Sequence, residues 1–374
     1  MTFPATLNLY VARRFLTATL LMLLALTLLV ALFDFIELLR RAATRPDASF
    51  AVVAGIAGLR LPFVAMQILP FAVLLGGIVA FWRLTRSSEL VVARAAGISA
   101  WSFLSGPVLV ATLFGALAIT AVSPVSSAML NRAERLDASY LRAGGGVTAL
   151  AGGRLWLRQA DRGIEPGGVA IITGRPSRIL GTDRLAEFAL AEVTVWRLSA
   201  QDRPLARIEA PRARLLPGRW QLDDAVSFGP DRQPSAPAVL TLATDLTPDR
   251  IEDSFASPDT LSFWALPGFI AVLEQAGFSA LRHRLQFQSM LSTPALAAAM
   301  ALLAAGFSMR QTRRGGVAQM IGAGVAAGFA LFVLDRVTSE FGESGALPVW
   351  IAAWVPTVAG LLLAAALLLH LEDG

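Results

Sequence analysis

The chain has 374 residues, of which 55% are hydrophobic, and its mean hydropathy is +0.60, whereas soluble globular proteins average roughly 45–50% apolar residues. The formal net charge is +5, all 32 basic residues are arginines, and the sequence has neither lysine nor cysteine. These features exclude a water-soluble protein, a disulfide or thiolate metal site, and a Walker A loop, which needs a lysine on the phosphates.

Six apolar segments are long enough to cross a bilayer, because about 20 helical residues span its hydrocarbon core. They form two groups of three, separated by a polar middle: Phe15–Phe33, Leu61–Trp82 and Ala100–Leu130, then Leu285–Met309, Gly315–Leu334 and Ser344–Leu369. We therefore predict an α-helical membrane protein with six transmembrane helices in a 3+3 arrangement.

The charge distribution predicts how this chain is oriented. Residues 131–281 carry 17 Arg against 18 acidic residues, whereas the rest of the chain carries 15 Arg against 9. Arginines in the short connections 83–94 and 310–314 place these connections in the cytoplasm under the positive-inside rule. Both termini are then cytoplasmic and the polar middle is external. The basic excess indicates contact with anionic lipids rather than with nucleic acid, for which no motif is present.

The connection after the second apolar segment carries the signals of a short helix. Ser87 suits the N-cap and Glu89 the first turn, while Arg94 suits the last turn and Gly97 the C-cap. The sequence therefore predicts a helix over about 87–97.

The apolar side of this short helix, which includes Leu90 and Val91, is predicted to face the cytoplasm. It can lie on the lipid headgroups as an interfacial helix. Alternatively, it is a coupling helix that inserts into a groove of a cytoplasmic partner.

The polar middle has the pattern of an all-β domain. Short alternating or β-branched stretches are separated by Gly, Pro and Asp, and they are Arg154–Arg158, Val169–Thr173, Val193–Leu198, Arg219–Leu222 and Val239–Thr244. A single sandwich or jelly roll is predicted. A helical pattern over Leu261–Ala276 then leads back to the membrane.

The predicted organisation has four parts. They are residues 1–130 with helices one to three, 131–260 with a periplasmic jellyroll-like domain, 261–284 with a connecting helix, and 285–374 with helices four to six.

Several stretches resemble the LptF/LptG family of lipopolysaccharide export permeases, and its LptG branch in particular. They are Arg86–Ser99, Leu246–Ile251, Val333–Arg336 and Gly342–Pro348. The resemblance covers nearly the whole chain. It implies a permease subunit of an ATP-driven exporter that extracts lipopolysaccharide from the inner membrane and passes it, through its β-domain, to a periplasmic bridge.

The resemblance also implies the partners and cofactors. The chain is expected to pair with an LptF-like permease, an LptB-like ATPase dimer, and LptC-like and LptA-like bridge proteins. ATP and Mg are bound by the partner ATPase, so this chain needs no cofactor, metal or catalytic residue of its own. Glu89 matches the acidic position of the family's coupling helix, and Arg94, Leu90 and Val91 belong to the same helix.

A charged turn is predicted directly after the first membrane segment. Asp34, Glu37, Arg40 and Arg41 match a patch that faces the lipid cavity and gate in family members. The arginines can hold lipid A phosphates bidentately, or they are headgroup anchors. Asp34 departs from the family pattern, since some members carry a basic residue there.

Segment five contains a Gly-xxx-Gly pair at Gly324 and Gly328, which lets two helices approach closely. Tight packing explains the pair, and the resemblance implies in addition a lateral gate against the first helix of the partner permease.

Two other functional classes are kept as alternatives. The chain can be a membrane-anchored envelope enzyme, which would need a catalytic constellation in its outer domain, for instance around Asp223-Asp224 or Glu252-Asp253. It can also be a scaffold acting on another lipid. Adjacent carboxylates point to opposite faces of a strand, which disfavours the enzyme.

Overall fold

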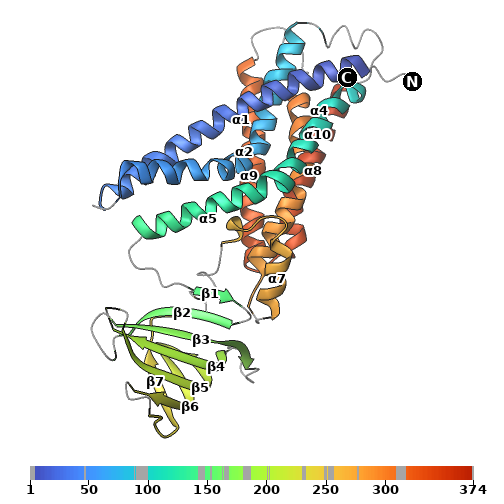
Figure 1. Cartoon of the computed structure of the whole chain (residues 1–374). Helices are drawn as coiled ribbons and strands as arrows, with labels where there is room; N and C mark the ends of the chain where they lie inside the picture. Colours follow the sequence, from blue (N-terminus) through green and yellow to red (C-terminus); the bar gives the residue numbers. More distant parts are fainter. Residues whose placement is uncertain are drawn as a thin grey trace. The chain divides into compact units, whose positions relative to one another are not determined.

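The computed structural model describes residues 5–45, 48–87, 89, 100–141, 148–151, 154–161, 163, 168–179, 187–199, 201, 203–229, 233–247, 251, 257–275, 278–308 and 317–372. The chain divides into two compact units (Figure 1). The helical unit comprises Met1–Arg142, Pro258–Pro267 and Leu281–Gly374, and the sheet unit comprises Ala143–Ser257 and Gly268–Ala280.

Six helices of the helical unit are long and apolar enough to cross a membrane, which confirms the predicted six-helix membrane architecture. They are α1 (Ala5–Ala42), α2 (Phe50–Arg86), the continuous span of α4 (Ala100–Leu117), π-helical η1 (Ala118–Val122) and α5 (Ser123–Tyr140), then α8 (Leu281–Ser308), α9 (Val317–Glu343) and α10 (Val349–Glu372).

Most of these helices extend beyond the apolar segments. The predicted turn after the first segment does not exist, because Asp34–Arg41 continues α1 up to Ala42. Ion pairs three and four residues apart stabilise this last stretch, and the first helix breaker is Pro46. Similarly, α5 continues to Tyr140, so the sheet unit begins at residue 143 rather than at 131.

Helix α8 is the centre of the helical unit. It packs against α2, α4, α9 and α10, and 56% of its most apolar window is buried, compared with 17% for α1 and 22% for α9. Small side chains such as Ala301, Ala304 and Ala305 make this close packing possible. The faces left open within the chain therefore belong mainly to α1 and α9.

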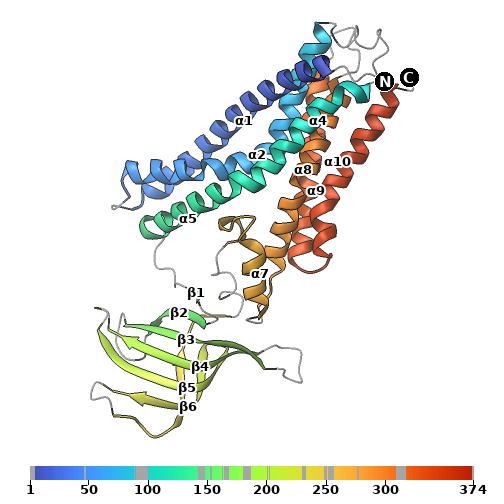
Figure 2. The ribbon, with the colours of Figure 1, turned by 45° about the vertical axis from the view of Figure 1, so that its right-hand side comes forward.

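Both chain termini lie at one end of the helical unit, together with the ends of α2 and α8 that border the two Arg-containing connections (Figures 1 and 2). At this end Arg14 lies over the ring of Tyr10, at 5.3 Å from its centroid, and Arg86 lies over Trp82, at 5.5 Å. Paired arginine and aromatic side chains are typical of a membrane–water interface.

The segment that returns from the sheet unit is fastened to the helical unit at the π-helical turn. The N–H of Phe263 donates to Ser123 Oγ (2.9 Å), and Nε1 of Trp264 donates to the carbonyl of Thr120 (3.1 Å). A π-turn leaves carbonyl groups out of the regular ladder, so they can accept bonds from other segments. Asn131 Nδ2 adds a bond to the carbonyl of Thr260 (2.6 Å).

The sheet unit contains one antiparallel sheet of seven strands in sequence order. They are β1 (Thr148–Ala151), β2 (Arg154–Asp161), β3 (Gly168–Ile179), β4 (Glu187–Leu198), β5 (Pro204–Leu216), β6 (Arg219–Phe228) and β7 (Ala238–Ala243). The inserted β-domain is therefore confirmed. Its jelly-roll topology is not, because each strand pairs with the next one along the chain, whereas a jelly roll needs two sheets linked by Greek keys.

One face of this sheet carries the core of the sheet unit. Leu155, Leu157, Val193 and Val195 are each at most 2% exposed, and they pack with helix α7 (Leu266–Gln275) through residues such as Leu273. Because side chains alternate along a strand, Trp156, Thr194 and Trp196 lie on the opposite face, where the two indoles stack at 5.7 Å between centroids.

The sequence pattern missed strand β5. Its central stretch contains Pro211 and several alanines and arginines, which are poor strand formers. The pairs Ala191↔Arg212 and Val193↔Ala210 place Pro211 opposite Glu192, whose φ of 51° marks a bulge. The proline thus occupies an irregular position of the ladder, where its missing N–H costs little.

A buried ion pair lies near one end of the sheet core. Arg197 donates to both carboxylate oxygens of Asp161, which is 3% exposed, and the N–H of Gly163 donates to the same group (3.0 Å). Burial alone raises the pKa of Asp161, but the bonds from Arg197 and Gly163 outweigh it and hold the pKa below its ordinary value.

We expect Arg197→Gln to destabilise the sheet unit by about 3 kcal/mol at pH 7, because it leaves a buried carboxylate without its cation. The folded-state pKa of Asp161 is lowered, so this stabilisation is present above its ordinary pKa of about 4 and is lost as the pH falls below it. Hydrogen–deuterium exchange of β2 and β4 in the whole chain measures it. Arg207→Gln, which breaks an exposed pair with Glu209, is the control and should cost less than about 1 kcal/mol; equal effects would contradict the prediction.

Candidate functional site

The charged end of α1 is an ion-pair cluster. Arg40 donates to both oxygens of Glu37 (2.9 Å each), and Arg41 donates to its Oε1 (3.1 Å). The arginine side chains are 79% and 48% exposed. Exposed guanidinium groups that share one carboxylate keep donors free for a phosphate, so the cluster can still bind an anionic headgroup.

Asp34 lies in a different environment from its neighbours on α1. Its carboxylate accepts hydrogen bonds from Nη1 of Arg60 on α2, at 3.0 and 3.4 Å, and the side chains of Asp34 and Arg60 are only 27% and 18% exposed. This pair joins α1 to α2 in the membrane-spanning part of the unit. Sequence reasoning missed it because it placed Arg60 in an external loop, although the helical spacing of both residues was the available signal.

We predict that the Asp34–Arg60 pair is structural. Asp34→Arg places two cations side by side and should lower the stability of the helical unit by about 3 kcal/mol. The exchanged double variant Asp34→Arg/Arg60→Asp should recover most of the thermal stability, measured by the loss of monodisperse protein in detergent on heating. A double variant that is as unstable as the single one would contradict the prediction.

The Gly-xxx-Gly pair of α9 packs against α2 of the same chain. A Cβ built on Gly324 would come within 2.4 Å of Ile78 Cδ1, and one on Gly328 within 2.6 Å of Leu74 Cδ2. The glycines therefore accommodate an intramolecular contact, and they do not face a partner helix. This finding separates the two residues from the gate role that the resemblance implied for them.

The opposite side of α9 and much of α1 remain uncovered in the described part of the chain. Exposed large apolar side chains on α9 are Ile321, Val325, Phe329, Phe332, Val333, Val337 and Phe341. On α1 they include Leu20, Leu21, Leu24, Leu28, Leu32, Phe33 and Ile36. In a membrane such faces contact lipid or another subunit, so they replace the glycine pair as the candidate gate surface.

The predicted coupling helix lies mostly outside the described residues. Leu90, Val91 and Arg94 belong to the segment that is not described, and only Glu89 can be placed. Ser87, predicted as an N-cap, instead ends α2, since its N–H donates to the carbonyl of Arg83. The Ser87 hydroxyl also donates to Glu89 Oε1 (2.8 Å), which positions this carboxylate directly after α2.

The sheet unit was also searched for the constellation that an enzyme would need. Asp223 accepts bonds from Arg214 (3.2 Å) and Gln221 (3.1 Å), and the bond from Arg214 lowers the pKa of its carboxyl. Asp224 has a φ of 50° at an irregularity of β6. Among the described residues no group of three His, Cys, Asp or Glu side chains is placed to bind a metal ion.

Comparison with known proteins gives one consistent result. The family model described as "Lipopolysaccharide export system permease LptF/LptG" matches residues 9–370. The "Lipopolysaccharide export system permease protein LptG" of Escherichia coli (strain K12) is 26% identical over 382 residues, which cover 97% of this chain and 98% of that protein. The protein of the same name from Haemophilus influenzae is 22% identical over 360 residues, covering 94% and 95%.

Proposed function

Because the chain belongs to the LptF/LptG family of lipopolysaccharide export permeases, on its LptG branch, we propose that it is the LptG-like half of an ATP-driven exporter. In this role it extracts lipopolysaccharide from the inner membrane and passes it through its sheet unit to a periplasmic bridge. The observation that carries the proposal is the family match over residues 9–370, which includes six helices and an inserted β-domain.

The energy for this process comes from a partner. The chain has no lysine for a phosphate-binding loop, so ATP and Mg are held by an LptB-like ATPase dimer. The stroke enters through the loop that begins at Glu89 and moves the helices as rigid bodies. This assignment requires the end of the helical unit that carries both termini to face the cytoplasm, and the Arg14–Tyr10 and Arg86–Trp82 pairs at that end support it.

The lipid path lies between this chain and an LptF-like permease. The uncovered faces of α1 and α9 border the shared apolar cavity, since α1 and α9 are the spans with the smallest buried fractions. Arg40 and Arg41, which are exposed beside α1's apolar face, hold the phosphates of lipid A. Glu37 holds both guanidinium groups in place between binding events.

The sheet unit hands the lipid to LptC-like and LptA-like bridge proteins. Its end strands β1 and β7 each pair with one neighbour in the described sheet, and an edge strand of this kind can be extended by strand addition. The buried face then continues into the partner as an apolar path for acyl chains.

Photo-crosslinking tests which face of the sheet carries lipid. Crosslinkers at Leu157 and Val195 should capture lipopolysaccharide during ATP-driven transport, because both side chains point into the apolar core. Crosslinkers at Trp156 and Thr194, on the same strands but the opposite face, are the matched controls. Capture only at the control positions, or at none, would contradict this path.

Copurification tests the proposed assembly directly. The tagged chain, extracted from its native membrane in mild detergent, should bring down one second permease and an ATPase in stoichiometric amounts. Depletion of the chain should also stop lipopolysaccharide from reaching the outer membrane. An envelope enzyme or a scaffold would instead purify without an ATPase.

A further inference from the structure

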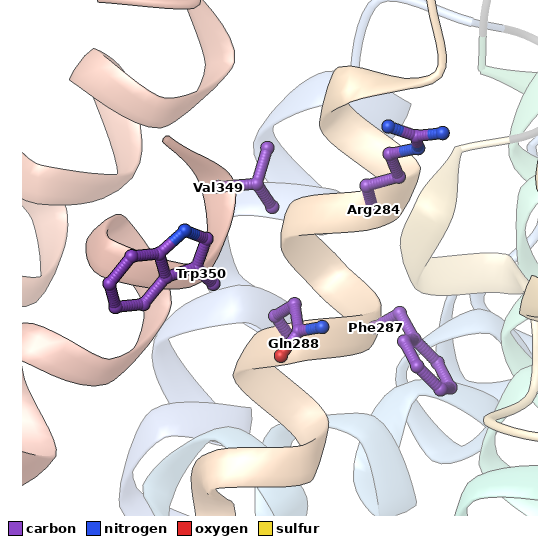
Figure 3. Close-up of a pocket in the computed structure, with 5 residues that line it drawn as sticks. All are labelled: Arg284, Phe287, Gln288, Val349 and Trp350. Atoms are coloured by element: carbon purple, nitrogen blue, oxygen red, sulfur yellow. The ribbon is translucent and has the colours of Figure 1, made fainter. Parts of the chain in front are cut away.

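A cavity of about 370 Å³ lies between the N-terminal turns of α8 and α10 (Figure 3). Arg284, Phe287 and Gln288 line it from α8, and Val349 and Trp350 line it from α10. The cavity lies at the end of the helical unit away from the termini (Figure 1). It is separate from the α1 and α9 surfaces assigned to transport.

The α8 wall of this cavity offers hydrogen-bond donors. Arg284 and Gln288 are four residues apart, so they share one face of the helix. Nε1 of Trp354 donates to Gln288 Oε1 (3.3 Å), which fixes the orientation of the amide. Among the described residues no acceptor is bonded to Gln288 Nε2, and its two N–H groups are available beside the guanidinium.

The α10 wall is apolar. Val349 and Trp350 begin this helix, and the indole of Trp350 is 63% exposed. Both helices are membrane spans, and the cavity is within two turns of their first residues. The site is therefore at the depth where phosphate groups meet acyl chains, a level at which exposed tryptophan is enriched.

We propose that this cavity binds one anionic phospholipid of the surrounding membrane. Its phosphate receives hydrogen bonds from Arg284 and Gln288, and the beginning of one acyl chain lies along Val349 and Trp350. The lipid fills the gap between α8 and α10 and fastens the outer ends of these helices together.

The cavity's size and chemistry favour a phospholipid over the transported glycolipid. A volume of about 370 Å³ is at the small end of the range for ligand pockets, roughly 300–1,000 Å³. It accommodates one phosphate group and part of a chain, but not the several chains and two sugars of lipid A. The arginine selects a headgroup with net negative charge, whereas a zwitterionic headgroup brings its own cation.

Native mass spectrometry of the delipidated full chain in detergent tests the proposal. Titration with phosphatidylglycerol should show a first lipid that binds wild type about fivefold more tightly than it binds Arg284→Gln. Phosphatidylcholine with the same acyl chains should not distinguish the two proteins. Photoactivatable phosphatidylglycerol should label the peptide that contains Trp350.

The control is Arg282→Gln, which removes a neighbouring arginine of the same helical turn that lies outside the cavity and pairs with Glu343 (3.6 Å). It should bind the lipid like wild type, and Arg284→Lys should keep part of the preference and confirm that the fold is intact. Equal binding by wild type and Arg284→Gln, or equal loss in Arg282→Gln, would overturn the proposal. Displacement of the lipid by millimolar inorganic phosphate would instead reveal a site for free anions. Because binding is read without ATP or lipopolysaccharide, its failure leaves the transport assignment untouched.

Discussion

Replacement of Gly76 by alanine is expected to destabilise the helical unit by about 3 kcal/mol, because two helix backbones meet there. A Cβ at this position would come within 2.6 Å of Thr19 Cα and 2.9 Å of Thr19 N. Backbone atoms cannot rotate away as the end of a side chain can. The whole of α1 must therefore shift relative to α2, and the neighbouring contact of Gly77 with Phe15 (3.0 Å) would be lost with it.

Gly58 provides a matched control on the same helix. A Cβ built there meets no atom within 4 Å, and alanine is the better helix former, so Gly58→Ala should be neutral or slightly stabilising. The measurement is the melting temperature of each purified variant in the same detergent. Similar melting temperatures for Gly76→Ala and Gly58→Ala would show that α1 and α2 are not in backbone contact.

Replacement of Glu89 by lysine is expected to reduce ATP-driven lipopolysaccharide release at least tenfold. In the proposed complex this carboxylate meets the ATPase, and reversing a charge in such an interface costs several kcal/mol, at about 1.4 kcal/mol per tenfold change. The chain itself should fold normally, because the contact of Glu89 with Ser87 is on the exposed side of the α2 terminus.

Two variants separate this coupling role from a local structural effect. Ser87→Ala removes the hydroxyl that holds the carboxylate and caps α2, so it should keep most of the release activity. Glu89→Asp should retain more activity than Glu89→Lys. Wild-type release by Glu89→Lys, or an equal loss in Ser87→Ala, would show that Glu89 does not couple the two subunits.

Hydrophobicity and alternation predicted the architecture because both are properties of single segments. Apolar runs identified all six membrane helices, and alternating side chains identified five of the seven strands. Burial of Leu155 and Val195 follows from the same alternation. The ends of helices were less predictable, since charged residues such as Glu37 and Arg41 end an apolar run but continue a helix through their ion pairs.

Contacts between distant segments could not be predicted in this way. The glycines at 324 and 328 indicate a close helix contact, but nothing in their spacing says that the neighbour is α2 of the same chain. The Asp34–Arg60 pair likewise depends on how α1 and α2 align. Strand β5 was missed because the pairing of its neighbours, rather than its own composition, holds Pro211 in the sheet.

The central claim is that this chain forms the lipid path of an ATP-driven exporter, and transport by reconstituted complex tests it most directly. The complex copurified with this chain is placed in proteoliposomes that contain lipopolysaccharide, and release to an added soluble bridge protein is measured with and without ATP. We predict release that requires ATP and that is at least tenfold lower with Glu89→Lys. ATP hydrolysis without any release, in a complex that retains this chain and its partner permease, would contradict the account.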